Sequence, residues 1–323
     1  MTGKRVTLRE IAEATGLGVS TVSYVLMGKG LKRVSEANQQ RILEAARRLH
    51  YTPNLMARGL RSGSSRFVGA LVPELATSFM PEILTGMDDT LAAAGYSIIL
   101  CSFKDDDNVV DKARRLLDHQ VDGLIVRSWC DLDALEAMLP PGFPMVWVAR
   151  PPTETHPAAL SGAQELVDLT VETLWRLGHR RFAFARSQLT DDRSARYEQT
   201  LAKLDAPAPQ FLPERTGGEL VERMLSGNAT VLVASDYVAI EVLLAARGRG
   251  VRIPERFSVF GNDGLPEGRL TVPGLTTAAQ LRKEQGIAAA QMLLQWIQEG
   301  KCPETTVLMP YLVERGSVAQ VVS

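Results

Sequence analysis

The sequence predicts an all-α N-terminal domain followed by a doubly wound, parallel α/β body. Three observations lead to this fold class. Residues 1–65 carry 11 Lys and Arg but only 4 Asp and Glu, whereas the whole chain of 323 residues has a net charge of −1. The basic part contains short helical segments separated by glycines. From Phe67 onward, apolar runs alternate with amphipathic stretches, as buried parallel strands and their covering helices do.

The composition is that of an ordinary globular protein, with 45% hydrophobic residues. No run approaches the roughly 18 apolar residues of a membrane span, and the N-terminus lacks the apolar core of a signal peptide. Cys101, Cys130 and Cys302 are widely spaced, which fits a reducing compartment and argues against a zinc site. We therefore expect a cytoplasmic protein with no membrane contact and no cofactor.

Two short helices joined by a glycine-containing turn are predicted at the N-terminus. Thr7 and Glu10 form a capping box that opens the first helix, and Gly16-Leu17-Gly18 ends it. The second helix spans residues 19–27, and a third runs from 35 to about 50. The positions expected to be buried are Val22, Val25, Leu26, Ile42, Leu43, Ala46 and Leu49. A helix-turn-helix places its second helix in the DNA major groove, and the basic charge favours a polyanion; a plain three-helix bundle is the alternative.

The two halves of the stretch PNLMARGLRSGSS, residues 53–65, predict different structures. Its first half suits a short helix, whereas Ser62-Gly63-Ser64-Ser65 has the composition of a flexible linker. About eight residues are too few for a stable isolated helix in water. The residues alone therefore leave three possibilities: a helix, a linker, or a helix that forms only under some conditions.

The segments TLREIAEATGLGVSTVSYVLMGKG, VSEANQQRILEAARRLHYTPN and ARGL resemble the DNA-binding domain of the LacI/GalR family of bacterial transcription regulators. This resemblance implies that a hinge helix folds when two subunits meet on operator DNA, with Leu60 wedged into the minor groove. It also implies base reading by Val19, Ser20 and Tyr24. The candidate DNA-binding residues are Thr7, Val19, Ser20, Thr21, Ser23, Tyr24, Asn54, Arg58 and Leu60.

Two departures from the family pattern bear on the operator. Gly18 stands where the family usually has a capping serine, and a glycine is a weaker cap that is still acceptable. Tyr24 stands where Arg or His is usual, and tyrosine cannot hold guanine in the bidentate way that arginine does. We therefore expect an operator half-site that differs from the common one of the family.

The body is predicted from its alternation of strands and helices. The strand-like runs are residues 67–72, 97–102, 123–126, 145–149, 182–185, 231–234 and 258–261. The amphipathic helical stretches are residues 79–94, 107–119, 164–177, 192–204, 217–226 and 236–249. About a dozen such units fit two lobes better than one sheet, and no glycine-rich dinucleotide fingerprint or Walker loop is present.

The segments GALVPELATSFMPEILTGMD, VDGLIV, LGHRRFAF and VRIPERFSVFGNDG resemble the effector-binding body of the same family. That body is similar to periplasmic sugar-binding proteins, with two lobes hinged by three crossovers. The predicted domains are 1–53, a helix-turn-helix; 54–65, a hinge helix and linker; and 66–323, the effector-binding and dimerisation domain. Lobe one is expected at about 66–160 and 281–309, and lobe two at about 161–280 and 310–323. We expect a homodimer, with contacts that include the helix near 79–94.

Ligands of open α/β sheets bind beyond the carboxyl ends of the strands. The candidate effector-binding residues by this rule and by the resemblance are Phe79, Met80, Arg127, Arg150, Arg193, Asp236 and Asp263. The strand ends gain Arg127, Arg150 and Arg186. Compared with the family pattern, Ala149-Arg150 stands where an Asp is common, and Ser161-Gly162-Ala163 lacks the usual Asp-Asn ahead of Gly-Ala. Arginine forks match carboxylates and phosphates, so an anionic effector, such as a sugar phosphate or an organic acid, is one hypothesis. A neutral sugar or nucleoside, and a body that only dimerises, are the others; local acids could also pair with these arginines.

No catalytic constellation is apparent. None of the four histidines has a cysteine or carboxylate at metal or triad spacing, and no Gly-x-Ser-x-Gly motif exists. Residues 105–107, three aspartates, fit a helix start better than a metal site. We therefore expect no enzyme, no catalytic residue and no metal, and a ligand-binding receptor or a sugar enzyme stays a remote alternative. The expected function is a sequence-specific transcription regulator, a repressor of metabolic genes controlled by a small-molecule effector.

Overall fold

The computed structural model describes residues 6–27, 33–51, 64–73, 80–104, 109–127, 132–186, 192–213 and 216–321. The chain separates into two compact units, residues 1–65 and 66–323. Each unit is described by itself below.

The first unit contains α1 (Leu8–Thr15), α2 (Val19–Leu26) and α3 (Glu36–Arg48). The predicted capping box opens α1: the Thr7 hydroxyl accepts from the Glu10 backbone N–H at 3.3 Å, and the Glu10 carboxylate accepts from the Thr7 N–H at 2.6 Å. Gly16 ends α1 in the left-handed region, with φ of 63°, where a residue without a Cβ is favoured.

The core of this unit is a small apolar cluster made by all three helices. Its buried members are Ile11, Ala12, Val22, Val25, Ile42, Ala45 and Ala46. The expectation that Leu43 is buried was wrong, because Leu43 is 40% exposed. The helical repeat of 3.6 residues explains the difference: from Ile42 the inward positions recur at 45 and 46, which places Leu43 on the outer side.

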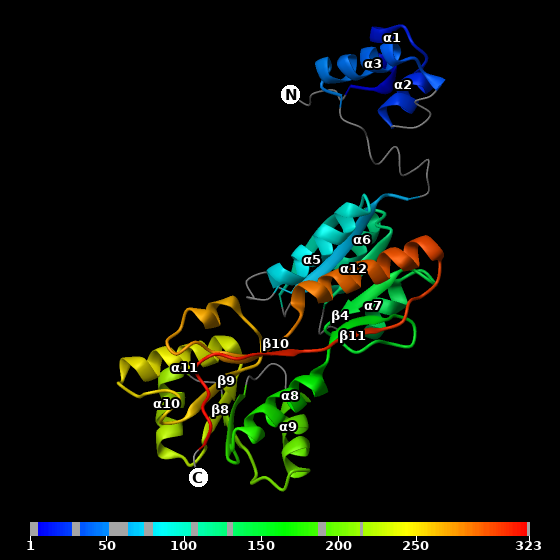
Figure 1. The fold of residues 1–323 in the computed structure, drawn as a ribbon. Coiled ribbons are helices and arrows are strands. Elements are labelled where there is room, and N and C mark those ends of the chain that lie inside the picture. Colours follow the sequence, from blue (N-terminus) through cyan, green and yellow to red (C-terminus); the bar gives the residue numbers. More distant parts are fainter. Residues whose placement is uncertain are drawn as a thin grey trace. The chain divides into compact units, whose positions relative to one another are not determined.

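The second unit contains two six-stranded sheets (Figure 1). The first has the order β11-β5-β4-β3-β1-β2, with strands β1 (Phe67–Pro73), β2 (Ser97–Phe103), β3 (Gly123–Val126), β4 (Met145–Val148), β5 (Ala158–Ser161) and β11 (Thr306–Leu308). The second has the order β12-β10-β9-β8-β6-β7, with β6 (Phe182–Arg186), β7 (Gln210–Pro213), β8 (Val231–Ala234), β9 (Ser258–Gly261), β10 (Thr276–Ala279) and β12 (Tyr311–Val313). The described pairings are parallel, except that β10 and β12 are antiparallel.

Helices cover both faces of each sheet, as the doubly wound prediction requires. On the first sheet, α5 (Met80–Ala93) and α12 (Arg282–Glu299) share one apolar cluster with the strands, and α6 (Val109–Asp118) and α7 (Leu132–Met138) share the other. On the second sheet, α10 (Gly217–Ser226) and α11 (Asp236–Gly248) cover one face, and α8 (Ala163–Arg176) and α9 (Asp192–Ala202) cover the other. The central strands β1, β3, β4, β8 and β9 are buried on both faces, which explains their continuous apolar runs.

The two sheets repeat one strand order. In each, the first strand in sequence lies between the second and the third, so the order reverses beside it. In sheets of this kind the crevice for a ligand opens beyond the carboxyl ends of the strands at that reversal. The relevant positions are therefore those that follow β1 and β3 in the first sheet, and β6 and β8 in the second.

Helices α5 and α12 cross at two glycines (Figure 1). A Cβ atom on Gly86 would overlap the Lys283 carbonyl oxygen, and one on Gly286 would overlap the Ile83 carbonyl oxygen. These two positions must lack a side chain because the backbones of the two helices are in contact there. The contact fixes the start of α12 relative to the first sheet.

Candidate DNA-binding surface and effector cleft

The second helix of the first unit presents a mixed apolar and hydroxyl surface to solvent. Val22 and Val25 are buried in the core of this unit, whereas Val19 is 44% and Tyr24 is 52% exposed. Ser20 is also exposed, and Thr21 is half-buried. The residues predicted to read bases are thus brought together on the outer side of α2. Two large apolar or aromatic side chains left in water on so short a helix indicate a contact surface.

The helix begins in a way that suits phosphate groups. Gly18 occupies the cap position and makes no side-chain hydrogen bond to the first turn of α2. The first N–H groups of a helix have no partner within the helix, and together with the helix dipole they bind anions. Thr7 is a DNA-binding candidate that lies outside α2. Unlike the exposed side chains of α2, its hydroxyl is engaged locally, because it donates to Glu10 Oε2 at 3.0 Å. Its side chain is therefore engaged in the cap of α1.

Five described arginines of this unit are exposed, and they supply the positive field that DNA binding requires. They are Arg9, Arg33, Arg41, Arg47 and Arg48. The other DNA-binding candidates, Asn54, Arg58 and Leu60, lie outside the described residues. Whether their segment is a helix, a linker or a conditional helix therefore stays a prediction.

In the second unit, the candidates lie beyond the carboxyl ends of strands. Arg127 follows β3, and its N–H donates to the Leu71 carbonyl of β1 at 2.9 Å. Asp236 and Asp263 follow β8 and β9. Phe79 and the aspartates at 105–107 lie outside the described residues, as does the side chain of Arg186.

Asp236 has a structural role, which corrects the expectation that it binds an effector hydroxyl. Its side chain is fully buried, with 0% exposure. One carboxylate oxygen accepts from the Asp263 N–H at 3.0 Å and the Thr277 hydroxyl at 2.7 Å. The other accepts from the N–H groups of Gly264 at 2.9 Å and Leu265 at 2.7 Å. A carboxylate has about four acceptor sites, so all of them are occupied by the protein itself.

Met80 also departs from expectation. It is fully buried in the apolar cluster between α5, α12 and the first sheet. It is the first residue of α5, and the helix turns its side chain toward the sheet. We therefore assign Met80 to the core of lobe one and not to a ligand surface.

Asp263 belongs to an ion pair that the sequence did not suggest. Its Oδ1 accepts from Arg282 Nη2 at 2.8 Å, and its Oδ2 accepts from the Asp236 N–H at 2.9 Å. Arg282 is the first residue of α12 and is only 7% exposed. The pair therefore joins the segment after β9 of the second sheet to the helix that covers the first.

Arg282 was missed because it starts a helix instead of following a strand. One signal in the sequence could have found it. A cation at the first position of a helix opposes the helix dipole, and here Lys283 follows it with a second positive charge. A locally unfavourable residue at such a place often has another task.

The arginines of this region influence one another. Burial, and then the charge of Arg282, lower the pKa of Arg127 to about 10. Burial also lowers the pKa of Arg282, against the opposing effect of Asp263, and Arg193 lowers it further. Arg282 is therefore close enough to Arg127 and to Arg193 for their positive charges to interact. Arg150, which follows β4, instead places its guanidinium 5.6 Å from the centre of the Trp147 ring and is half-buried.

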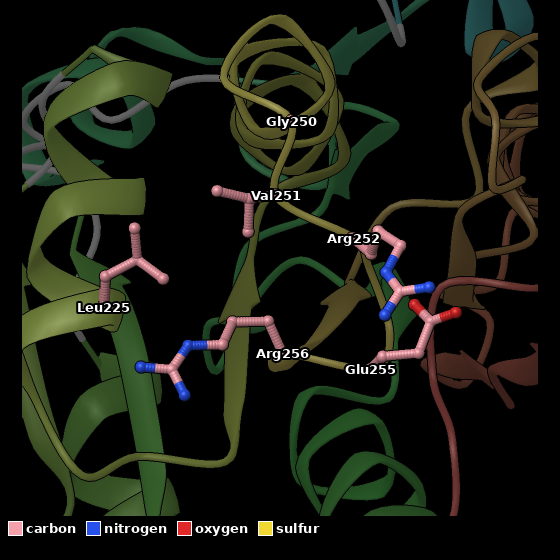
Figure 2. Close-up of a pocket in the computed structure, with 6 residues that line it drawn as sticks. All are labelled: Leu225, Gly250, Val251, Arg252, Glu255 and Arg256. Atoms are coloured by element: carbon pink, nitrogen blue, oxygen red, sulfur yellow. The ribbon is translucent and has the colours of Figure 1, made fainter.

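A surface pocket of about 330 Å³ lies elsewhere on the second sheet (Figure 2). Figure 2 shows Leu225 at the end of α10 on one side and residues 250–256 on the other. Residues 250–256 precede β9, whereas Asp263 follows it. The pocket therefore lies at the amino ends of the strands, away from the candidate cleft.

Two of the described histidines, His156 and His179, are buried and make contacts inside the fold. His156 contacts Glu136 through Nδ1 at 2.8 Å, and His179 contacts the Thr230 hydroxyl at 2.9 Å and the Ala319 carbonyl at 3.1 Å. Within the described ranges, no three His, Cys, Asp or Glu side chains are arranged to hold a metal ion. In the same ranges, no helix combines the length and apolar composition needed to cross a membrane.

Two family models match the chain, each on one of the two units. Residues 7–54 match the model described as bacterial regulatory proteins, lacI family, and residues 171–318 match a periplasmic binding protein-like domain. The ribose operon repressor of Halalkalibacterium halodurans is 29% identical over 310 residues, which is 91% of each chain.

Solved structures have the same fold. The lac repressor dimer bound to operator and the anti-inducer ONPF matches with a TM-score of 0.86 and 23% identity, over 98% of this chain and 100% of that chain. A LacI family regulator from Enterococcus faecium with bound ribose matches with a TM-score of 0.71 and 24% identity, over 79% of this chain and 100% of that one. The chain therefore joins a helix-turn-helix unit that matches the lacI family model to a two-sheet body that matches a periplasmic binding protein-like domain.

Proposed function

We propose that this protein is a transcription repressor that binds a specific DNA operator as a homodimer and is controlled by a small-molecule effector. The observation that carries the proposal is the outer face of α2, where Val19, Ser20 and Tyr24 are exposed on a basic three-helix unit. Such a face fits the major groove, and the arginines around it fit the phosphate backbone. Because its target is chromosomal DNA, the protein acts in the cytoplasm.

The dimer brings two recognition helices to two half-sites. Exposed apolar side chains on α11 and just after the neighbouring 3-10 helix (Pro266–Arg269) support self-association. These side chains, Tyr237, Leu244, Leu270 and Val272, are 57% to 74% exposed. The helix that the sequence suggested for dimer contacts, α5, instead exposes Asp88 and Asp89 among its described residues. We therefore place the principal contact of lobe two at this α11 patch.

The segment after residue 53 would form the paired hinge helices of that dimer. Leu60 is proposed to insert between base pairs at the operator centre, because an apolar wedge in the minor groove bends DNA toward the protein. The Leu60→Ala variant should then lose specific binding more than non-specific binding. Equal losses on the operator and on random DNA would remove Leu60 from this role.

The body supports control by an effector. The relative is named a ribose operon repressor, and the Enterococcus faecium structure holds ribose in a body of this fold. In the present chain, Arg127 follows β3 beside the reversal of the first sheet, Arg193 lies at the start of α9 after β6, and Asp263 follows β9. We propose that the effector binds there and shifts the population between a DNA-binding and a released state.

The test is selection of DNA fragments by the purified full-length protein at physiological salt, with the bound fragments sequenced. A near-palindrome with a flexible pyrimidine–purine step at its centre is expected. The Tyr24→Ala variant, run in parallel, should still select the palindrome but with one base position relaxed. Binding that depends on salt but shows no enriched sequence would refute a sequence-specific repressor.

A further inference from the structure

Resting on the function proposed above, we infer that the effector is a small oxyanion, a carboxylate or phosphate compound, bound by Arg127 and Arg282 in exchange for Asp263. Arg127 is among the residues that sequence position suggests, whereas Arg282 and the competing role of Asp263 come from the contacts in the structure.

The two aspartates beyond β8 and β9 are engaged by the protein itself. Asp236 uses both oxygens for four donors of the protein and has no exposed surface. Asp263 places one oxygen on Arg282 and the other on the Asp236 N–H. Sugar hydroxyls are bound largely as donors to carboxylates, so the saturation of Asp236 and the pairing of Asp263 with Arg282 make the site less suited to a neutral polyol.

The donors, by contrast, are concentrated there. Arg127 and Arg282 are each only 7% exposed. The charge of Arg282 lowers the pKa of Arg127, and the charge of Arg193 lowers the pKa of Arg282, which Asp263, Glu82 and Asp236 raise. Like charges repel strongly when they are withdrawn from water. A ligand with one or two negative charges relieves this repulsion, and the planar guanidinium matches carboxylate and phosphate oxygens with two parallel hydrogen bonds.

Asp263 is the internal counter-ion that holds Arg282 in the unliganded protein. It is fixed in place, because its N–H donates to Asp236 and its Oδ2 accepts from the Asp236 N–H. An arriving oxyanion replaces the Asp263 carboxylate at Arg282. Because Asp263 follows β9 and Arg282 begins α12, the exchange loosens one contact between the second sheet and the helix that covers the first. Binding of the effector is thereby coupled to the relation between the lobes.

The experiment is calorimetric titration of the full-length protein with glucose 6-phosphate, citrate and inorganic phosphate, and with glucose and ribose as neutral probes. Glucose and its 6-phosphate differ only in the charged group. We expect binding of at least one anion and at least about tenfold weaker binding of the neutral sugars. The variants Arg127→Lys and Arg282→Lys keep the charge but lose the fork, and should each weaken that anion by about tenfold.

The decisive variant is Asp263→Asn. If Asp263 competes with the ligand, this variant should bind the anion more tightly, by roughly three- to tenfold. If Asp263 instead binds ligand hydroxyls, the same variant should bind more weakly, and that result would overturn the inference. The matched control is Arg114→Gln, because Arg114 is an exposed arginine that pairs with Asp111 at 3.0 Å on the surface of α6. It removes one positive charge from the same lobe and should change no affinity.

Two further results would also overturn the inference: glucose binding as tightly as glucose 6-phosphate, or no binding by any of the three anions. Should an arginine variant fail to fold, Asp263→Asn alone decides the question. Failure of this inference is distinct from failure of the proposed function, because the DNA selection is read without any effector. A protein that selects a palindrome but binds only neutral sugars would keep its role as a repressor and lose only the effector class.

Discussion

Asp236 provides the sharpest test of how the second sheet is held together. Replacing it with asparagine keeps the shape of the side chain but leaves one oxygen to accept from the four groups that now donate to the carboxylate. The remaining oxygen can serve Gly264 and Leu265, and the Thr277 hydroxyl can turn to accept from the new amide. The N–H of Asp263, which now donates to the carboxylate at 3.0 Å, then faces a donor. A buried N–H left without its acceptor costs about 1–3 kcal/mol.

Two features of the structure reduce this cost. Thr277 Oγ1 lies 3.3 Å from the Asp263 N–H and offers it a second acceptor. Burial, and then the neighbouring charge of Asp263, raise the pKa of Asp236, so the substitution also removes an unfavourably placed charge. We therefore expect Asp236→Asn to lower the free energy of unfolding by about 2 kcal/mol, and Asp236→Ala to lower it further.

The assay is urea unfolding of the full-length protein followed by tryptophan fluorescence. All four tryptophans lie within residues 66–323, so the signal reports the body and not the N-terminal unit. Asp111→Asn is the control: the same change on an exposed carboxylate of α6, expected to alter stability by less than about 0.5 kcal/mol. Equal, small effects of Asp111→Asn and Asp236→Asn would refute the structural role. A stable Asp236→Asn variant that had lost effector binding would restore the ligand role.

Three further predictions concern other parts of the molecule. Tyr24→Ala should relax sequence preference at one base position by about 1–3 kcal/mol in competition binding, whereas a uniform loss on all sequences would make Tyr24 a phosphate contact. Leu244→Asp should convert the dimer to a monomer in analytical sedimentation. Leu204→Asp, at a leucine that is 37% exposed, is the control and should leave the dimer intact. A Leu244→Asp variant that stays dimeric would show that the interface does not include Leu244. Burial lowers the pKa of His179 from 6.5 to about 4, so the folded state favours the neutral ring. The contribution of this ring to the free energy of unfolding is therefore complete above pH 6.5, and it falls by up to about 3 kcal/mol as the pH is lowered toward 4. Urea titrations from pH 4 to pH 7.5 should show this slope in the parent and a flatter one in His179→Gln, and equal slopes would contradict it.

The sequence predicted mainly those strands that lie inside the two sheets. All seven apolar runs are strands, and six of them are central strands covered by helices above and below. The seventh, residues 97–102, lies in the edge strand β2, which is only partly buried. The strand at Thr276–Ala279 was not predicted, although its residues are buried. The Thr276 hydroxyl accepts from the Arg315 N–H, and the Thr277 hydroxyl donates to Asp236. Such partners satisfy buried threonines but, being distant in sequence, leave no local pattern.

The sequence proposed candidate residues for the cleft but not their contacts. Asp236 and Asp263 were candidates because each follows a strand, and in the structure they are hydrogen-bonded to each other. Position in the sequence could not show that the backbone N–H groups after β9 donate to Asp236 and occupy its acceptor sites. That occupation depends on the exact path of the loop after β9. Position in the sequence also could not reveal Arg282, whose proximity to Asp263 arises from the return of the chain between the lobes.

The late position of α12 in the chain has a consequence for synthesis. On α5, the apolar residues Ile83, Met87 and Leu91 are covered by Ala290 and Leu293 of α12. A nascent chain that has reached residue 200 has already produced α5 but not its cover. The N-terminal unit, whose core lies within residues 11–46, has no such delay and completes its fold first. Each ribosome therefore carries a finished DNA-reading module on an unfinished body with an exposed apolar face, a state in which chaperones have a surface to bind.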